Sequence, residues 1–290
     1  MKILFGLLIT VSFVVVVTSC QKEVDWSLPN TTTTDSTVLW KYVVIDTTLS
    51  AGLDTLEVHY FEYDNQKRLT RLIDSLREDT SSSPAYTSSS GTDLFYNGNE
   101  TLPFKSIQID KDGADRRWDT AYFSYQGQLV SMDSSRVQIS NFSGNTWGIV
   151  ALYFTKSGNS VTMIERFPNP PGPPTCETTS IIAQTYSSGN IASEMATSTG
   201  CVTGSWDDQM TYDNKMNPFY KAIPVHYPVT DYSFMGNDQN NNMTEESSLS
   251  MGIHTQRTYT YRSNGLPSVV RVNDLNFPGY SYKGIYYYKN

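Results

Sequence analysis

The apolar and polar positions along this chain repeat a short unit. In most copies an aromatic residue ends a strand-like segment, a turn of Asp, Asn, Gly or Ser follows, and an aliphatic residue begins the next segment. Turns of this composition tolerate positive φ angles and suit β-hairpins. A spacing of about thirty residues is typical of repeat architectures, so each copy is predicted to close one hairpin. The seven copies lie at residues 63–69, 96–102, 125–129, 155–161, 186–191, 212–219 and 261–266.

The segments between these turns have the composition of β-strands. They are rich in aromatic, β-branched and Thr residues, and none has a sustained apolar period of 3.6 residues. An all-β fold with little helix outside an N-terminal signal peptide is therefore predicted. The expected strands are 56–63, 69–76, 121–125, 149–155, 161–167, 180–186, 256–261 and 285–288.

Neither face of these strands is cleanly apolar. In the first strand Leu56 and Val58 share one face, whereas Phe61 and Tyr63 share the other. Two half-apolar faces fit a compact sandwich poorly, because a sandwich requires one dry face. A wide antiparallel sheet tends to curl. We therefore predict a long antiparallel meander of about seven hairpins in a strongly curved or barrel-like sheet.

Two segments are predicted to lack regular structure. After Leu28, residues 29–37 are Pro, Asn, Thr, Asp and Ser, and the segment 28–37 has no apolar periodicity, which indicates a flexible tether. The proline-rich stretch 168–174 cannot pair inside a sheet and is expected to be an extended connection between two hairpins. The folded part is expected to be one β-repeat domain, residues 38–290.

The N-terminus has the features of an export signal. Lys2 is followed by the apolar stretch 3–17, which is shorter than the roughly 20 residues of a membrane-spanning helix. We therefore predict that residues 1–19 are a signal peptide and that residues 20–37 precede the domain as a lipidated N-terminus and tether.

The sequence Val17-Thr18-Ser19-Cys20 resembles a bacterial lipoprotein signal. The resemblance implies cleavage before Cys20 and acylation of its thiol and new amino group, with palmitate among the expected acyl chains. An ordinary secretory signal with a chance cysteine is the alternative. Lys22 and Glu23 resemble the sorting signal of Bacteroidota surface lipoproteins, which implies an outer-membrane, surface-exposed location. Attachment at the periplasmic face is the alternative.

The charge of the chain excludes some partners. The formal net charge is -8, and removal of the signal also removes Lys2, its one charged residue. No Lys/Arg-rich run is present, which argues against nucleic acid and against electrostatic adhesion to anionic lipid. The polar surface of Ser, Thr, Asn and Tyr is compatible with glycan contact, and is also usual in exported β-proteins.

Two cysteines remain after Cys20. In an oxidising compartment Cys176 and Cys201 are expected to form a disulfide. Their midpoint lies between Ser188 and Gly189, the centre of a predicted turn. A regular hairpin closed there would place the two cysteines directly opposite one another, whereas a single bulge would shift the register. No Cys-x-x-Cys is present, so a redox-active pair is not expected.

Metal or cofactor chemistry is not predicted. His59, His226 and His254 are far apart and lack a recognised metal spacing, and His59 is expected to be packed or hydrogen-bonded within a strand. The run 237–242, followed by Glu245 and Glu246, lacks the pattern of a calcium loop and is predicted to be a solvated loop.

Glycoside hydrolysis remains an alternative because it needs two facing carboxylates, which the sequence cannot place. Trp206 beside Asp207 and Asp208 has the composition of a sugar site, although a turn after Cys201 is the preferred interpretation. The aromatic residues could stack sugar rings, but cross-strand Tyr pairs in a wide sheet are favoured. The other candidate carboxylates are Asp64, Glu165, Glu194, Glu245 and Glu246.

The turns carry two resemblances. Tyr63-Asp64-Asn65 and Tyr212-Asp213-Asn214 resemble the tyrosine–aspartate repeats of wall-associated and Rhs-type bacterial proteins. The stretch 211–215, running into 217–219, more closely resembles Bacteroidota lipoproteins of unknown function with a porin-like β-fold. That family implies a curved β-sheet and an exported location, and supplies no active site. A lipid-spanning porin is not expected, because the strands lack sustained lipid-facing apolar alternation.

The sequence therefore predicts an uncharacterised cell-envelope lipoprotein that is a non-enzymatic binding or structural module. Its expected partners are the membrane, through Cys20, and a surface glycan or envelope protein. A surface carbohydrate-active enzyme is one alternative, and would require a concave site with two carboxylates among aromatic residues. An accessory subunit of an uptake or export assembly is the other, and would require an exposed apolar patch.

Overall fold

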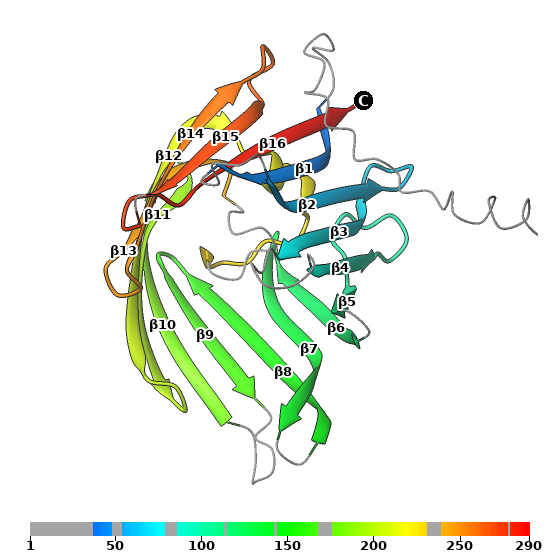
Figure 1. The fold of residues 1–290 in the computed structure, drawn as a ribbon. Helices are drawn as coiled ribbons and strands as arrows, with labels where there is room; N and C mark the ends of the chain where they lie inside the picture. The colour runs from blue at the N-terminus through cyan, green and yellow to red at the C-terminus, as the bar shows by residue number, and fades with distance from the viewer. Residues whose placement is uncertain are drawn as a thin grey trace, which may run out of the picture. The chain divides into compact units, whose positions relative to one another are not determined.

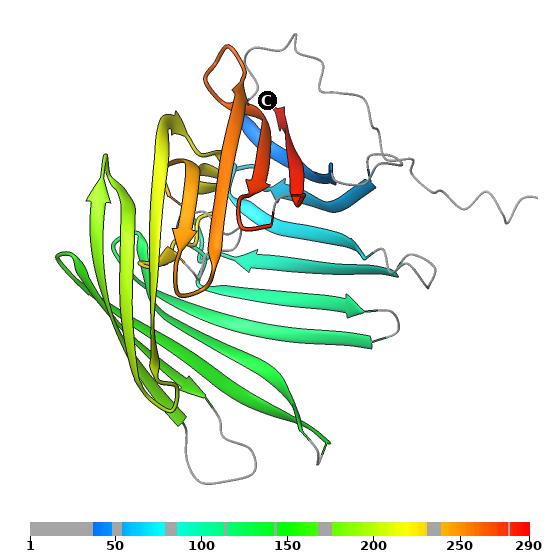
Figure 2. The same cartoon turned by 60° about the vertical axis from the view of Figure 1, so that its left-hand side comes forward.

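A computed structural model describes residues 37–47, 54–78, 86–112, 115–141, 144–167, 176–230, 239–277 and 279–290. The described strands pair with their sequence neighbours, and the first pairs with the last, so that one antiparallel sheet closes into a barrel (Figures 1 and 2). The strands are β1 (Val38–Asp46), β2 (Asp54–Tyr63), β3 (Leu69–Glu78), β4 (Tyr86–Phe95), β5 (Lys105–Asp112), β6 (Asp115–Gln126), β7 (Leu129–Asn141), β8 (Gly144–Ser157), β9 (Ser160–Phe167), β10 (Cys176–Ser187), β11 (Asn190–Gly200), β12 (Gly204–Met216), β13 (Asn241–Ser248), β14 (Ile253–Tyr261), β15 (Pro267–Asp274) and β16 (Ser281–Lys289).

This architecture confirms the prediction of an all-β, barrel-like meander, with more hairpins than the seven expected. The closing pair is antiparallel, with Tyr42 opposite Tyr286 and Val43 opposite Ile285, and its register shifts once, between Leu39 and Lys41. The predicted signal 1–19, the tether except Thr37, and the proline-rich stretch 168–174 lie outside the described residues. No helix in the described part of the chain is long and apolar enough to cross a membrane.

The seven repeated units all lie at one end of the barrel, which we call the turn rim. They connect β2 to β3, β4 to β5, and so on to β14 and β15, and Val38 and Lys289 lie at the same end. In an antiparallel meander every second connection returns to the same end, so the thirty-residue period corresponds to two strands. The connections at the opposite end, the loop rim, do not carry the repeated unit.

The aromatic residue of the unit has a structural role at the turn rim. The hydroxyl groups of Tyr63, Tyr96 and Tyr125 donate to the backbone oxygens of Leu39, Leu69 and Pro103, at 2.7, 2.6 and 2.8 Å. Each bond therefore joins one hairpin to the preceding part of the rim. Burial raises the pKa of all three tyrosines, which keeps the hydroxyl groups protonated as donors.

The sixth repeated unit begins a segment that leaves the barrel wall. Residues 217–230, here called the strap, contain the short helix α2 (Pro218–Ala222), whose N-cap Asn217 accepts a hydrogen bond from the backbone of Phe219. The ring of Phe219 lies 5.0 Å from that of Tyr42 and 5.6 Å from that of Tyr286. The predicted hairpin at 212–219 is therefore wrong in this detail.

The far part of the strap packs against a different wall. Val225, Tyr227 and Val229 lie in a cluster with side chains of β6 to β11, among them Phe154 and Ile182. In the closed ring of strands, β8 and β9 lie opposite β1 and β16. The strap therefore crosses the lumen from one wall to the other, and appears as the yellow segment within the ring of strands in Figure 1.

A disulfide joins Cys176 and Cys201, with their Cα atoms 5.8 Å apart. The pairing was predicted, but the register that supported it is wrong. A bulge between Thr185 and Tyr186 shifts the hairpin, so that Thr178 lies opposite Gly200. A regular extension would therefore place Cys176 opposite Val202 rather than Cys201.

Gly200 allows the chain to bend so that Cys201 reaches Cys176 despite the bulge. Its φ of +112° is a conformation that L side chains rarely adopt, and an added Cβ would collide with the carbonyl of Glu177. The chain bends at this point, and the backbone N–H of Cys201 donates to the oxygen of Glu177 at 3.1 Å. The bend carries Cys201 back toward Cys176.

The double substitution Cys176→Ser and Cys201→Ser is expected to lower the free energy of unfolding by about 3–4 kcal/mol, because the unfolded chain regains the entropy of a closed loop. Urea denaturation of both proteins measures the difference. Reductant should destabilise the native chain and leave the double variant unchanged. Two titratable thiols besides Cys20 in the non-reduced chain would contradict the pairing.

Candidate functional site

The lumen of the barrel is acidic. On β2, for example, Phe61 packs against Phe219 of the strap, which shows that Phe61 faces inward. His59 lies two residues away on the same strand, so it faces inward as well. Among the strand residues whose side chains are described, the inward cations are His59, Lys156 and Arg257, and the inward carboxylates outnumber them. This excess disfavours anionic ligands. By register, the inward carboxylates are Asp46, Glu57, Asp74, Asp110, Asp119, Asp133, Glu165, Glu194, Asp208, Glu246 and Asp274.

A cavity of ≈ 550 Å³ lies between β1, β2, β14, β15 and β16 and the strap, and we call it the inner cavity. Asn217 and Phe219 of the strap belong to its lining, so the strap forms part of its boundary. A volume of this size is typical of a site for a small molecule. The side chains considered below are Tyr42, Glu57, His59, Asn217, Phe219, Arg257, Tyr259, Tyr282 and Tyr286.

His59 lies between two carboxylates. Its Nδ1 is 2.5 Å from Asp74 Oδ1, and its Nε2 is 3.1 Å from Glu57 Oε2. Burial lowers the pKa of His59, but the hydrogen bonds to Asp74 and Glu57 outweigh it and raise the pKa to about 9. His59 is therefore a protonated, paired cation at neutral pH, which agrees with the prediction that it is packed and hydrogen-bonded.

Arg257 is the second cation of the inner cavity. Its Nη2 lies 2.7 Å from Glu246 Oε2, and both side chains are largely buried. Since Arg257 and His59 each have a carboxylate partner, the cavity presents paired charges to a ligand. Their remaining N–H and oxygen positions can still form hydrogen bonds.

Tyrosines supply most of the aromatic surface of the inner cavity. The rings of Tyr42 and Tyr286 lie 4.8 Å apart, and Gly284 makes this possible because an added Cβ would occupy the position of the Tyr42 side chain. Burial raises the pKa of Tyr259 and Tyr282, as well as those of the first two. All four hydroxyl groups therefore remain protonated.

Buried polar groups hold the far end of the strap. Gln184 Nε2 donates to the backbone oxygen of Pro228 at 2.6 Å, and the Thr230 N–H donates to Glu194 Oε2 at 3.1 Å. The hydroxyl of Tyr227 donates to Asp133 Oδ2 at 2.6 Å. Burial raises the pKa of Asp133, although this hydrogen bond acts in the opposite direction. Both ends of the strap are therefore fixed to the barrel wall.

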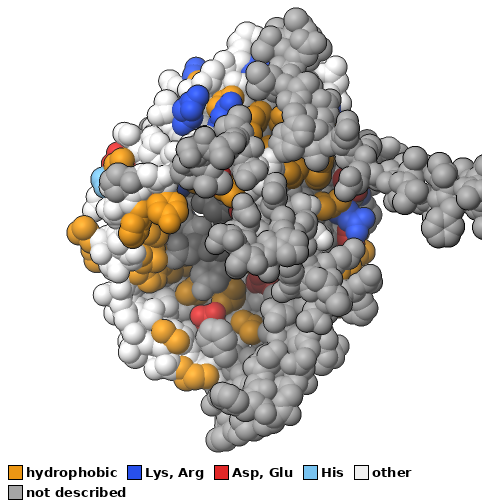
Figure 3. All heavy atoms as spheres, viewed as in Figure 1, with side chains coloured by type: hydrophobic (Ala, Val, Ile, Leu, Met, Phe, Trp, Pro, Cys, Tyr) orange, Lys and Arg blue, Asp and Glu red, His pale blue; other side chains and the backbone are white. Residues whose placement is uncertain are grey.

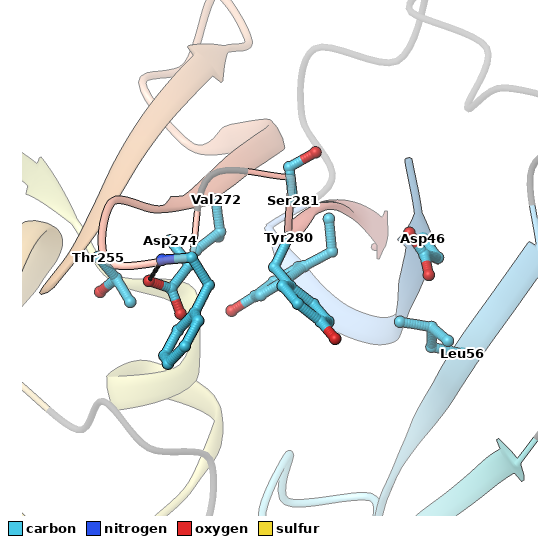
Figure 4. Close-up of a pocket in the computed structure, with 9 residues that line it drawn as sticks. Asp46, Leu56, Thr255, Val272, Asp274, Tyr280 and Ser281 are labelled. Atoms are coloured by element: carbon cyan, nitrogen blue, oxygen red, sulfur yellow. Dashed lines mark hydrogen bonds between the residues drawn. The ribbon is translucent and has the colours of Figure 1, made fainter. Parts of the chain in front are cut away.

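A second cavity of ≈ 510 Å³ lies nearer the loop rim, and we call it the mouth cavity. It shares Leu56, Val272 and Tyr282 with the inner cavity, so the two are adjacent along one wall. Figure 4 shows Asp274 and Asp46 on opposite sides of this cavity, with Tyr280 between them.

Exposed apolar side chains gather on three connections of the loop rim. These are the connections from β11 to β12, β13 to β14, and β15 to β16. Figure 3 shows hydrophobic side chains on the side of the molecule where the last two lie. Such a patch is the feature that the accessory-subunit alternative requires. The exposed residues are Val202, Leu249, Met251, Leu275, Phe277 and Tyr280.

The proposed sugar cluster around Trp206 is not formed. Trp206 and Asp208 face the lumen on β12, whereas Asp207 faces outward, where its backbone N–H and its carboxylate bond Ser250. The preferred turn after Cys201 is also wrong here, because these residues lie within a strand. Glu194 lies beside Asp208 across β11 and β12, but both are buried and Glu194 holds the strap.

The remaining candidates are dispersed. His226 lies in the strap against Tyr220, and His254 pairs with Glu245 at 2.9 Å on the outer wall. No group of three or more His, Cys, Asp or Glu suited to a metal occurs among the described residues. Asp64 caps its own turn by accepting from the backbone of Gln66. Glu165 faces the lumen on β9.

The run considered for calcium is partly outside the described residues, which begin again at Gln239. Gln239 and Asn241 form hydrogen bonds near Asn217, where the strap begins, and do not belong to a solvated loop. Gln239 Oε1 accepts from the backbone of Ile191 at 3.0 Å, and Asn241 exchanges hydrogen bonds with Asn190.

The strap was missed, although the sequence contains a signal for it. Ile223, Val225, Tyr227 and Val229 alternate as in a strand, but prolines interrupt the segment. Prolines exclude such a segment from the interior of a sheet. An apolar segment that cannot join the sheet must be buried elsewhere, and in a barrel the lumen is available. The prolines are Pro218, Pro224 and Pro228.

The substitution His59→Gln is expected to destabilise the barrel in a pH-dependent way. The pKa of His59 is about 9 in the folded chain and 6.5 in its ordinary state, so its stabilisation is complete below pH 6.5 and is lost as the pH rises through 9. The difference in free energy of unfolding from the native chain should reach on the order of 2–3 kcal/mol near pH 6 and shrink toward pH 10.

Denaturation curves between pH 6 and pH 10 measure this difference. The matched control is His254→Gln, whose ion pair with Glu245 is exposed on the outer wall. A difference for His59→Gln that stays constant with pH would contradict the assignment of a protonated histidine.

No family model and no curated protein matches this sequence. Similar solved structures include a porin-like protein from Bacteroides uniformis, with 14% identity, a TM-score of 0.51, and coverage of 88% of this chain and 98% of that chain. A porin-like protein from Bacteroides vulgatus has 10% identity and a TM-score of 0.47, and covers 87% of this chain and 99% of that chain. The similarity to the first shows a shared fold, and confirms the porin-like part of the resemblance.

Proposed function

We propose that this chain is a non-enzymatic lipoprotein of the cell envelope that binds a neutral saccharide inside its barrel. The observation that carries the proposal is the inner cavity, where tyrosine rings surround charged side chains that are already paired. A surface glycan was the predicted ligand, and the lumen is now the proposed place of binding.

The pairing of charges favours a neutral ligand. His59 has Asp74 and Glu57 as partners, and Arg257 has Glu246. A charged ligand would need one of these pairs to open, which is costly for buried groups. A neutral hydroxyl group can instead accept from Arg257 or donate to Glu57 without breaking a pair.

The aromatic surface favours a saccharide among neutral ligands. The hydroxyl groups of a sugar need several donors and acceptors, while its C–H face packs on aromatic rings. Tyr259 and Tyr282 provide both ring surface and hydroxyl groups, and Phe219 of the strap adds a further ring. The strap holds Asn217 and Phe219 rigidly at this cavity, which reduces the ordering that binding requires.

The outer wall supports a barrel in water rather than in lipid. Along β14 and β15 the outward residues other than Val269 are polar, and they include Gln256, Thr258, Arg271 and Asn273. A lipid-spanning barrel presents an apolar band at these positions, and charged residues there are unfavourable. We therefore place the barrel beside the outer membrane, held through Cys20 and the tether, with surface exposure as the proposed location.

The substitution Cys20→Ala is expected to release the protein from the membrane, because the acyl chains provide the proposed attachment. Metabolic labelling with palmitate and fractionation of cells measure the effect, and Cys176→Ser is the control that keeps Cys20. Protease treatment of intact cells should degrade the native protein if it is displayed on the surface. Membrane retention of the Cys20 variant would contradict the anchor.

A screen of the unlipidated mature chain on a glycan array is expected to identify neutral saccharides, with affinities then measured by calorimetry. Tyr282→Ala should weaken binding by about five-fold or more, since removal of one aromatic contact and hydroxyl costs about 1–3 kcal/mol. The control Tyr122→Ala removes an outward tyrosine that is 50% exposed. Equal losses in the two variants would contradict a site in the lumen.

Glycoside hydrolysis is the second candidate, since Asp46 and Asp274 face one concave space with Tyr280 and Tyr282. Asp274 Oδ1 accepts from the backbone of Asn276 and Phe277, which assigns that oxygen a structural role in the loop. Release of reducing sugar by the native chain, abolished by Asp46→Asn, would favour the enzyme. Binding without release favours the module.

A further inference from the structure

We propose that the ligand is an amphiphile, with a neutral hydroxyl-rich head in the inner cavity and an apolar tail in the mouth cavity. The inference rests on the proposed saccharide site and adds the class of molecule that carries the saccharide. It follows from the adjacency of the two cavities and from the change in their lining.

The two cavities adjoin along the wall. Leu56, Val272 and Tyr282 belong to both, and they lie on β2, β15 and β16. In the closed ring β2 and β16 flank β1, and β15 lies next to β16. A ligand longer than the inner cavity can therefore extend past these three side chains toward the loop rim.

The lining becomes more apolar from the inner cavity to the mouth cavity, although the carboxylates of Asp46 and Asp274 remain in the lining of the mouth. Glu57, His59 and Arg257 line the inner cavity and are absent from the lining of the mouth cavity. Phe277 and Tyr280 are added at the mouth. A uniform polymer would not match this change, whereas a molecule with one polar and one apolar end does.

Thr255 marks the junction between the two environments. It lies on the inner face of β14, two residues from Arg257, and lines the mouth cavity. Its Oγ1 is buried and has no hydrogen-bond partner within the described part of the chain. Because this oxygen is enclosed, Thr255 contributes to the junction through its position and not as a hydrogen-bond partner of the ligand.

The aromatic residues at the mouth are exposed but held in place. Phe277 is 61% exposed and Tyr280 is 73% exposed, and their rings meet edge to face at 6.4 Å. Asp274 Oδ1 accepts from the Phe277 N–H at 3.0 Å, and the Tyr280 N–H donates to the Phe277 oxygen at 3.0 Å.

The same loop is bonded to its neighbours. Asn276 Nδ2 donates to the oxygen of Gly252 at 2.5 Å, and the Leu275 N–H donates to the oxygen of His254 at 2.7 Å. A fixed loop that exposes two aromatic rings beside an apolar cavity is preorganised to cover a hydrocarbon tail.

The test uses the mature chain from Gln21 onward, which lacks acyl groups and retains the whole closed barrel. Calorimetry measures the affinity for methyl, butyl, hexyl and octyl β-D-glucopyranoside, all below their micellar concentrations, and for 1-octanol. The affinity is expected to rise about two- to four-fold per added methylene, as burial of each group against the mouth requires. 1-Octanol should bind at least ten-fold more weakly than octyl glucoside.

The double variant Phe277→Ser and Tyr280→Ser should abolish most of the dependence on chain length and leave the affinity for the methyl glycoside unchanged. Both side chains are exposed, so their removal should leave the fold intact, which circular dichroism checks. The matched control is Leu249→Ser, which removes a 90% exposed side chain of the same rim outside the cavity and should change nothing.

Four results would overturn the inference, and they separate it from the proposed saccharide site. Binding of all four glycosides with equal affinity would leave the saccharide site standing and remove the tail site. A chain-length dependence that Leu249→Ser reduces as much as the double variant would indicate adsorption to the rim. Octanol binding as tight as octyl glucoside, or no binding of any glycoside, would contradict the head site and the inference together.

Discussion

The pairing of β1 with β16 is the constraint on which the rest of the structure depends. Its hydrogen bonds join the two ends of the described sheet and bring Tyr42 beside Tyr286. The inner cavity lies at this seam, between the first two strands and the last three. Without the seam there is no wall to support Phe219, and the strap loses one of its two attachments.

The strap fills one side of the lumen and leaves space on the other side. Its apolar side chains fill the lumen near β6 to β11, while Asn217 and Phe219 leave space near the seam. The carboxylates of the inner wall have two structural roles in this arrangement. Asp133 and Glu194 hold the strap, and Glu57 and Glu246 neutralise the cations of the cavity.

Sequence reasoning recovered the fold because local chemistry sets it. The turns at 63–69 and 186–191 contain residues suited to hairpins, and a meander of hairpins has few ways to arrange itself. The tyrosine of the repeated unit was recognised in the sequence, but its structural role was not. The backbone oxygens that accept its hydrogen bonds belong to other hairpins. The disulfide was recovered through a regular register that the bulge at Thr185 invalidates.

The site could not be located in the same way. His59 meets Asp74 fifteen residues away, but Arg257 reaches the same cavity from the other end of the chain, and no local pattern links them. Trp206, Asp207 and Asp208 are adjacent in sequence, yet strand alternation sends them to opposite faces. Residues that are adjacent in a strand therefore lie on opposite faces of the sheet. Closure of the barrel instead brings together distant residues, and these line the cavity.

The contacts of Phe219 have a consequence for the order in which this chain acquires its structure. The ring meets Tyr42 near the beginning of the barrel and Tyr286 near its end, so it cannot be enclosed until almost the entire polypeptide has been delivered. The hairpin of Cys176 and Cys201 needs only its own residues and can form early. Contacts between distant parts of a chain are slow to form. Assembly should therefore begin with a central hairpin and finish when Phe219 of the strap packs against Tyr42 and Tyr286. Until its last strand docks, the chain stays accessible to chaperones and proteases.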